Sequence, residues 1–295
     1  MPDIQANGVK IAYETFGKPN DPAVLMIMGL GAQSAMWSQR MIDMIVDGGY
    51  RVIIFDNRDI GLSQKFPGRK PPKLVPQILA KRLGITLKAP YTLFDMAEDA
   101  VGVMDALEIE QAHVVGVSMG GMIGQIVSGH YPGRVLSLTA IMTTTNNFKL
   151  PRPSRDAMKA LSRRGPPPKT REAAIDLSVK VFGIIGTPGE DHNTNGYRDR
   201  IATSYDRNHN PDGLRRQTAA IIATGDFRHV TRQIKAPTLI IHGRVDPLVP
   251  VEGGIDIRDN VANSELHIID EMGHDIPPRH LDEIMSKMLA HFPAT

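Results

Sequence analysis

Ser118 is the residue of this chain whose surroundings most clearly favour chemistry. It lies at the centre of residues 116–120, Gly-Val-Ser-Met-Gly, between an apolar run at 112–115 and a helix-like stretch at 122–127. A serine at so sharp a strand-to-helix turn adopts strained backbone angles, and glycines on both sides relieve the crowding. The hydroxyl is then held clear of the chain, so Ser118 is predicted to be a nucleophile. A lone pentapeptide of this kind is common by chance, so the interpretation depends on partners downstream.

An acid and a base follow Ser118 in an informative order. Residues 237–243 have the composition of a buried parallel strand, and this strand runs into Asp246. The next apolar strand, 266–269, is followed by a loop that carries His274. We therefore predict that Asp246 is the acid and His274 the base of a Ser-Asp-His set, in which the base removes the serine proton and the acid orients the base.

Each partner has an alternative interpretation. Asp246 precedes a proline, so it could instead form a turn or cap a helix. If Asp246 is not the acid, Asp270 and Asp275 are the next carboxylates to consider. His242 ends a strand close to Asp246, so a role in the pocket is considered for it. Three other histidines are expected at surface positions: His130, His192 and His209.

The negative charge that develops when a serine attacks a carbonyl needs two converging N–H groups. One is expected from Met119, directly after the nucleophile, and the other from the loop that follows the apolar run 23–28. The glycines at 29 and 31 allow a tight turn there, which would direct the Leu30 amide at the site. Leu30 and Met119 are therefore the predicted oxyanion hole; a turn needed only for folding is the alternative.

The chain resembles the α/β-hydrolase superfamily over nearly its full length. Ser, then Asp, then His is the order of that superfamily. Within it, the chain is most similar to the branch of aclacinomycin methylesterase and related bacterial esterases. The motifs that carry this resemblance are residues 27–31, Trp37, residues 55–63, residues 113–121 and the pair Gly273-His274. Many members have His-Gly in the oxyanion loop where this chain has Met28-Gly29, a change that removes an imidazole and keeps the amide donor.

The resemblance implies ester hydrolysis without a cofactor or metal, through an acyl-enzyme on Ser118. The implied substrate is a small or medium ester, and a methyl ester is in keeping with the branch. The same triad also serves C–C bond hydrolases or lyases and perhydrolases, and these remain alternatives. A hydrolase-fold binding protein with little turnover is a further alternative, although it would have no need of all three residues.

The elements that must position these residues alternate regularly along the chain. After an opening hairpin with its turn at Asn7-Gly8, apolar strands are predicted at 23–28, 50–55, 112–117, 135–142, 237–242 and 265–269. Continuous apolar strands separated by helices predict an α/β fold with a mostly parallel central sheet and helices on both faces. A helix is expected from Asp95, as its cap, to Leu107, and another around 281–289.

Two insertions interrupt this alternation. Residues 143–216 are polar and proline-marked, with helical stretches near 154–164, 171–182 and 196–207, and are predicted to form a helical cap over the site. The core domain would then comprise 1–142 and 217–295. Within the cap, four residues are expected to make a mobile or sharply turning segment: Gly183, Gly186, Pro188 and Gly189. Residues 64–92 are basic and amphipathic, and would contact either the domain or an anionic membrane.

Residues 56–59, Asp-Asn-Arg-Asp, follow a buried strand and are predicted to pin loops rather than to catalyse.

A net charge of +2 over 295 residues gives no field for nucleic acid, and the absence of cysteine excludes disulfides and thiolate metal sites. No signal peptide or spanning segment is evident, so a cytoplasmic protein without stable membrane insertion is expected. The oligomeric state stays open.

Overall fold

The computed structural model describes residues 1–68, 76, 89–161, 168–194 and 196–293 of the chain. Most of the basic insertion expected at 64–92 therefore lies outside the described residues, and the question of what it contacts stays open. None of the helices in the described ranges is long and apolar enough to cross a lipid bilayer.

The strands of the described residues form one eight-stranded sheet in the order β1-β2-β4-β3-β5-β6-β7-β8. Their bounds are β1 Asp3–Ala6, β2 Val9–Phe16, β3 Ala23–Ile27, β4 Arg51–Phe55, β5 Ala112–Val117, β6 Val135–Ile141, β7 Thr238–Gly243 and β8 Ser264–Ile269. The β1–β2 and β2–β4 pairs are antiparallel, and the pairs from β4 to β8 are parallel. The predicted hairpin and mostly parallel sheet are confirmed.

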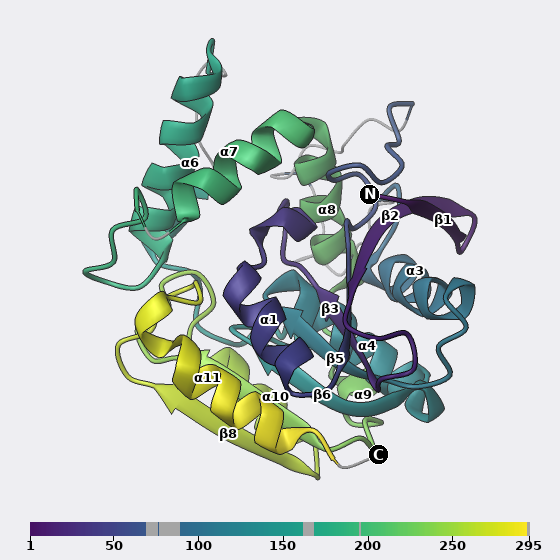
Figure 1. The fold of residues 1–295 in the computed structure, drawn as a ribbon. Helices are drawn as coiled ribbons and strands as arrows, with labels where there is room; N and C mark the ends of the chain where they lie inside the picture. The colour runs from purple at the N-terminus through teal and green to yellow at the C-terminus, as the bar shows by residue number, and fades with distance from the viewer. Residues whose placement is uncertain (69–75, 77–88, 162–167, 195, 294–295) are drawn as a thin grey trace.

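Helices and short 3-10 turns connect these strands. They are η1 Ser34–Met36, α1 Gln39–Asp47, α3 Leu93–Ala106, α4 Met119–His130, η2 Pro132–Arg134, α5 Arg155–Leu161, α6 Arg171–Ile185, α7 Tyr197–Arg207, α8 Pro211–Thr224, α9 Arg228–Thr231, α10 Glu252–Asn260 and α11 Pro278–His291. Figure 1 shows α6 and α7 apart from the layers that the sheet makes with its covering helices.

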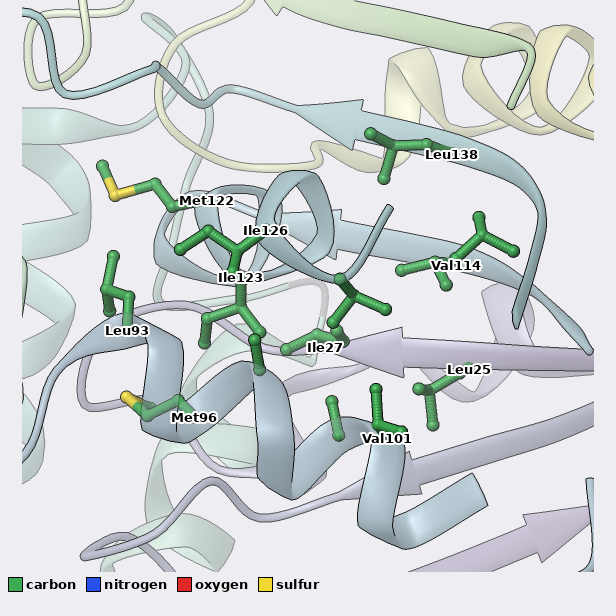
Figure 2. Packing of buried hydrophobic residues seen from close by; sticks show 14 of the residues in the cluster. Leu25, Ile27, Leu93, Met96, Val101, Val114, Met122, Ile123, Ile126 and Leu138 are labelled. Carbon is green, nitrogen blue, oxygen red and sulfur yellow. The ribbon is translucent and has the colours of Figure 1, made fainter. Parts of the chain in front are cut away.

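Each face of the sheet carries its own apolar core. On one face, α3 and α4 pack against side chains of β3, β5 and β6. Figure 2 shows Ile123 and Ile126 of α4 beside Met96 of α3 and Ile27 of β3. On the other face, α1 and α11 contribute methionines and isoleucines to a second cluster with β3, β4 and β7. Because both faces are covered, the central strands are mostly apolar, as their sequences predicted.

Two element boundaries differ from the expectation. Helix α3 begins at Leu93 and is capped by Thr92, whose side chain accepts from the Asp95 amide while the Asp95 carboxylate accepts from the Thr92 N–H. Asp95 is therefore the third helical residue of a capping box and not the cap itself. Helix α8 is continuous across the expected boundary between residues 216 and 217. The division into core and cap stays a prediction.

Candidate active site

Ser118 lies between the last residue of β5 and the first residue of α4, with φ 54° and ψ −121°. The neighbouring glycines are required by close backbone approach. A Cβ at Gly120 would lie 2.0 Å from the Ile27 carbonyl oxygen, and one at Gly116 would lie 2.3 Å from the Gly120 oxygen. Thr143 donates from its hydroxyl to the Ser118 carbonyl oxygen at 2.7 Å. The sharp turn is thus fixed by α4, by β3 and by the loop after β6.

The structure brings the predicted acid and base to this serine. His274 Nε2 lies 3.0 Å from Ser118 Oγ, and His274 Nδ1 lies 2.7 Å from Asp246 Oδ2. Both Asp246 and His274 are buried, and Ser118 is half-buried. The three residues follow the carboxyl ends of β5, β7 and β8, which meet at one edge of the sheet because these strands are parallel. The arrangement can pass a proton from Oγ to an imidazole held by a carboxylate.

Asp246 also forms the turn that its proline neighbour suggested. Its Oδ1 accepts hydrogen bonds from the Leu248 and Val249 amides, each at 2.8 Å, while Oδ2 faces His274. The two interpretations of Asp246, turn former and partner of the histidine, are therefore both satisfied, one by each oxygen. Because Oδ1 is held by two backbone donors, the carboxylate plane is fixed and Oδ2 has a defined direction.

His242 also supports the 246–249 turn. Its Nε2–H donates to the Val249 carbonyl oxygen at 2.8 Å and lies 3.7 Å from Asp246 Oδ2. Burial lowers the pKa of His242, which favours the neutral imidazole. A neutral ring leaves the Asp246 charge directed at His274. His242 therefore supports Asp246 and is itself fully buried.

The expected oxyanion loop lies against the serine. A Cβ at Gly29 would be 3.2 Å from Ser118 Cβ, so the backbone at Gly29 approaches Ser118 closely. Within the described part of the chain, neither the Leu30 nor the Met119 N–H donates to another backbone group. The assignment of these two amides to an oxyanion hole stays a prediction.

Side chains on both sides of Leu30 hold this loop in place. Asn57 donates from Nδ2 to the Met28 carbonyl oxygen at 3.0 Å. The Gly31 N–H donates to Gln217 Oε1 at 2.9 Å, and Gln217 in turn donates to the Arg58 carbonyl oxygen. Asn57 belongs to the turn 56–59 that was predicted to pin loops. Gln217 and Thr143 were not predicted as supports, because each acts on a residue far away along the chain.

The charged turn 56–59 pins loops, as predicted. Asp56 accepts from Ser34 and from Arg207 of α7. Its neighbours Arg58 and Asp59 form buried ion pairs, with Asp99 of α3 and with Arg216 of α8 respectively. The Tyr91 hydroxyl also donates to Asp59 at 2.7 Å. One turn therefore connects the core to two helices of the expected cap region.

The expected surface position of His192 is wrong. His192 is 3% exposed, and its Nε2 lies 2.7 Å from Asp275 Oδ2. The polar residues around it in the sequence suggested a solvated loop, but its carboxylate partner lies 83 residues away. The two alternative acids have other partners: Asp275 pairs with His192, and the exposed Asp270 pairs with Arg244. His130 and His209 are exposed, as expected.

No group of three histidine and carboxylate side chains that could hold a metal ion occurs among the residues that the structure describes.

Most of the chain matches a known family. The profile of the alpha/beta hydrolase fold matches residues 22–280. Rhodomycin D methylesterase DauP of Streptomyces sp. (strain C5) is 23% identical, over 98% of this chain and 96% of that protein. A 2-hydroxy-6-oxononadienedioate/2-hydroxy-6-oxononatrienedioate hydrolase of Pseudomonas sp is 27% identical, over 91% of this chain and 87% of that protein.

Solved structures agree on the fold. The esterase EaEST of Exiguobacterium antarcticum superimposes with a TM-score of 0.74 at 22% identity, covering 99% of both chains. The resemblance to the methylesterase branch is confirmed by the relatives, and the predicted fold class by the family match and the sheet. The chain belongs to the α/β-hydrolase family.

Proposed function

We propose that the protein is a serine-dependent carboxylic ester hydrolase that acts on small to medium esters. The observation that carries the proposal is the hydrogen-bonded series Ser118–His274–Asp246 at the sharp turn after β5. The Leu30 and Met119 amides, which donate to no other backbone group among the described residues, would complete the group needed for acyl transfer. The methylesterase relatives support the choice of an ester as substrate.

The geometry supports a two-step reaction. His274 Nε2 takes the proton of Ser118 as Oγ attacks the ester carbonyl carbon, and Asp246 stabilises the imidazolium that forms. The Leu30 and Met119 amides hold the oxyanion. His274 then returns its proton to the departing alcohol, which leaves an acyl group on Ser118. Water, activated by the same imidazole, cleaves this acyl-enzyme and releases the carboxylic acid.

A second candidate is hydrolysis of a carbon–carbon bond in a ketone by the same three residues. The observation that favours it is the similarity to the Pseudomonas 2-hydroxy-6-oxononadienedioate/2-hydroxy-6-oxononatrienedioate hydrolase and to other proteins of that name. Turnover of ketone acids of this kind, with no turnover of simple esters, would favour this candidate over the esterase. A perhydrolase would differ only in using peroxide in place of water as the acceptor.

The esterase proposal is tested with a series of p-nitrophenyl esters from acetate to palmitate. We expect wild-type turnover to peak at one chain length and to be lost in Ser118→Ala, with the circular dichroism spectrum unchanged. Ser178→Ala, which removes a hydroxyl bonded within α6, is the matched control and should retain wild-type rates. Retention of activity in Ser118→Ala would refute the assignment of the nucleophile.

A further inference from the structure

The loop that carries His274 is held from one side by residues of the expected cap. We call residues 185–194, which include the end of α6 and the segment after it, the clasp segment. The His274 N–H donates to the Ile185 carbonyl oxygen at 2.8 Å. The Gly273 N–H donates to Thr187 Oγ1 at 3.0 Å. Two successive amides of the histidine loop are therefore bonded to the clasp segment and not to the core.

Asp275, directly after His274, is the centre of this contact. The Thr187 amide donates to its Oδ1 at 2.9 Å, and the Thr187 hydroxyl also donates to Oδ1. His192 Nε2 lies 2.7 Å from its Oδ2, and Thr187, His192 and Asp275 are each at most 3% exposed. A buried carboxylate is costly unless it is paired and hydrogen-bonded, so these partners fix where residue 275 can lie.

Backbone packing shows how closely the two segments fit. A Cβ at Gly273 would lie 2.3 Å from the Gly186 carbonyl, and one at Gly243 would lie 2.0 Å from the Met272 carbonyl oxygen. The histidine loop is thus enclosed between the end of β7 and the clasp segment, with glycine on each contacting surface. The turn expected around Gly183–Gly189 is therefore anchored to the histidine loop from Ile185 onward.

Tyr197 of α7 also contacts Asp275 and its neighbour Ile276. Its hydroxyl lies 3.0 Å from the Ile276 carbonyl oxygen and 3.3 Å from Asp275 Oδ2. Burial raises the pKa of Tyr197, so the phenol keeps its proton and acts as a donor. The His192 ring packs edge-on against Tyr197 at 4.8 Å between centroids, which limits how far the imidazole can move from Asp275.

From these contacts we infer that Thr187 and His192 are positioning residues for the His274 imidazole. They act through Asp275 and Gly273, the two residues that flank His274, and they hold its ring between Ser118 Oγ and Asp246 Oδ2. The cap then contributes to catalysis through the placement of the base as well as through any contact with substrate. The inference rests on the proposed function, since it assigns a purpose to the placement of His274.

Four variants test it in pairs. Thr187→Val and His192→Phe keep size or ring stacking and lose the side-chain hydrogen bonds to the histidine loop, whereas Thr187→Ser and His192→Gln keep a side-chain donor in reach of Asp275. We expect kcat to fall about ten- to a hundred-fold in the first pair with KM changed less than about twofold, because small displacements of a base lower the rate of the chemical step. The second pair should stay close to wild type. Arg171→Gln, which breaks the exposed Arg171–Asp206 pair within the cap, is the control and should not change kcat.

A second measurement separates this inference from the esterase proposal. The ring nitrogens of 15N-labelled histidine, with the His274 signals assigned by their absence in His274→Gln, report the position of the imidazole without any substrate. We expect Thr187→Val and His192→Phe to change the chemical shifts of the His274 ring nitrogens, and Thr187→Ser and His192→Gln to leave them unchanged. Should wild type hydrolyse no ester, the esterase proposal fails and this measurement alone decides the inference. Wild-type kcat together with wild-type His274 signals in folded Thr187→Val and His192→Phe would overturn it.

Discussion

At the scale of single residues, the site depends on side chains that satisfy two demands at once. Asp246 holds the 246–249 turn with Oδ1 and the histidine with Oδ2. Ser118 accepts from Thr143 at its carbonyl oxygen while its hydroxyl faces His274. Because each of these residues is fixed by bonds that take no part in the reaction, its reactive atom has little freedom. Preorganisation of this kind lowers the barrier to proton transfer.

Asp246→Asn tests the proposed acid. An amide can still accept at Oδ1 from the two backbone N–H groups, so the turn should be retained. Its NH2 group would then face His274 Nδ1 and favour the wrong imidazole tautomer, for which we expect kcat to fall by about 10^4-fold. Steady-state kinetics on the preferred p-nitrophenyl ester measure the effect.

Asp270→Asn is the matched control, because Asp270 is exposed and pairs with Arg244 at the surface. It should retain wild-type rates. If Asp246→Asn were as active as this control, the assignment of the acid would be wrong.

At the scale of elements, the turn 56–59 forms ion pairs with residues of three helices, α3, α7 and α8. The Asp59–Arg216 pair is buried on both sides, with side chains 0% and 3% exposed. Gln217 follows Arg216 on α8 and accepts from Gly31 in the oxyanion loop. The ion pair and the support of the oxyanion loop are thus adjacent on one helix, so the position of α8 affects both stability and the proposed site.

Arg216→Met is expected to lower the free energy of unfolding by about 3–5 kcal/mol, because it leaves the buried Asp59 charge without its ionic partner. Urea unfolding followed by circular dichroism measures the change. Arg244→Met removes the arginine of an exposed pair and should cost less than about 1 kcal/mol. Equal losses in the two variants would show that burial does not determine the cost of breaking these pairs.

Elements whose signal is local were predictable from the sequence. The strands β3 to β8 are apolar runs between glycine, proline and polar residues, and their observed ends differ from the predicted ones by at most one residue. The start of α3 was misplaced because Thr92 and Asp95 are both good caps, and only the reciprocal capping box distinguishes them. Helix α8 was not anticipated as a unit, because the expected boundary of the cap divided its residues.

The supports of the site were not predictable, because their partners are distant. Thr143 and Ser118 are 25 residues apart, Gln217 and Gly31 are 186 apart, and His192 and Asp275 are 83 apart. Ser118, Asp246 and His274 could be named because each follows a recognisable strand, whereas a polar residue in a long insertion has no such reference. The sequence therefore indicates the proposed reacting groups more readily than the groups that hold them.

At the scale of the whole molecule, the sheet also buries titratable groups that play no part in the proposed reaction. His113 of β5 is fully buried, with its ring stacked on Phe292 at 4.4 Å between centroids and its Nδ1 2.8 Å from Ser137 Oγ. Tyr50 packs edge-on against the same ring at 5.5 Å. Phe292, which follows α11, thus packs on the central strand β5. The His113 imidazole occupies a place there that an apolar side chain would usually fill.

This histidine makes the stability of the fold depend on pH. Burial lowers the pKa of His113 from 6.5 to about 4. Between these values the unfolded chain binds a proton at His113 that the folded protein does not, so the free energy of unfolding rises with pH across this window and the contribution is complete above pH 6.5. His113→Asn keeps a polar partner for Ser137 and removes the titration. We expect the variant to reduce the slope by up to about 1.4 kcal/mol per pH unit. Urea unfolding at several pH values across the window, on wild type and variant, measures both slopes; parallel profiles would mean that His113 is protonated equally in the two states.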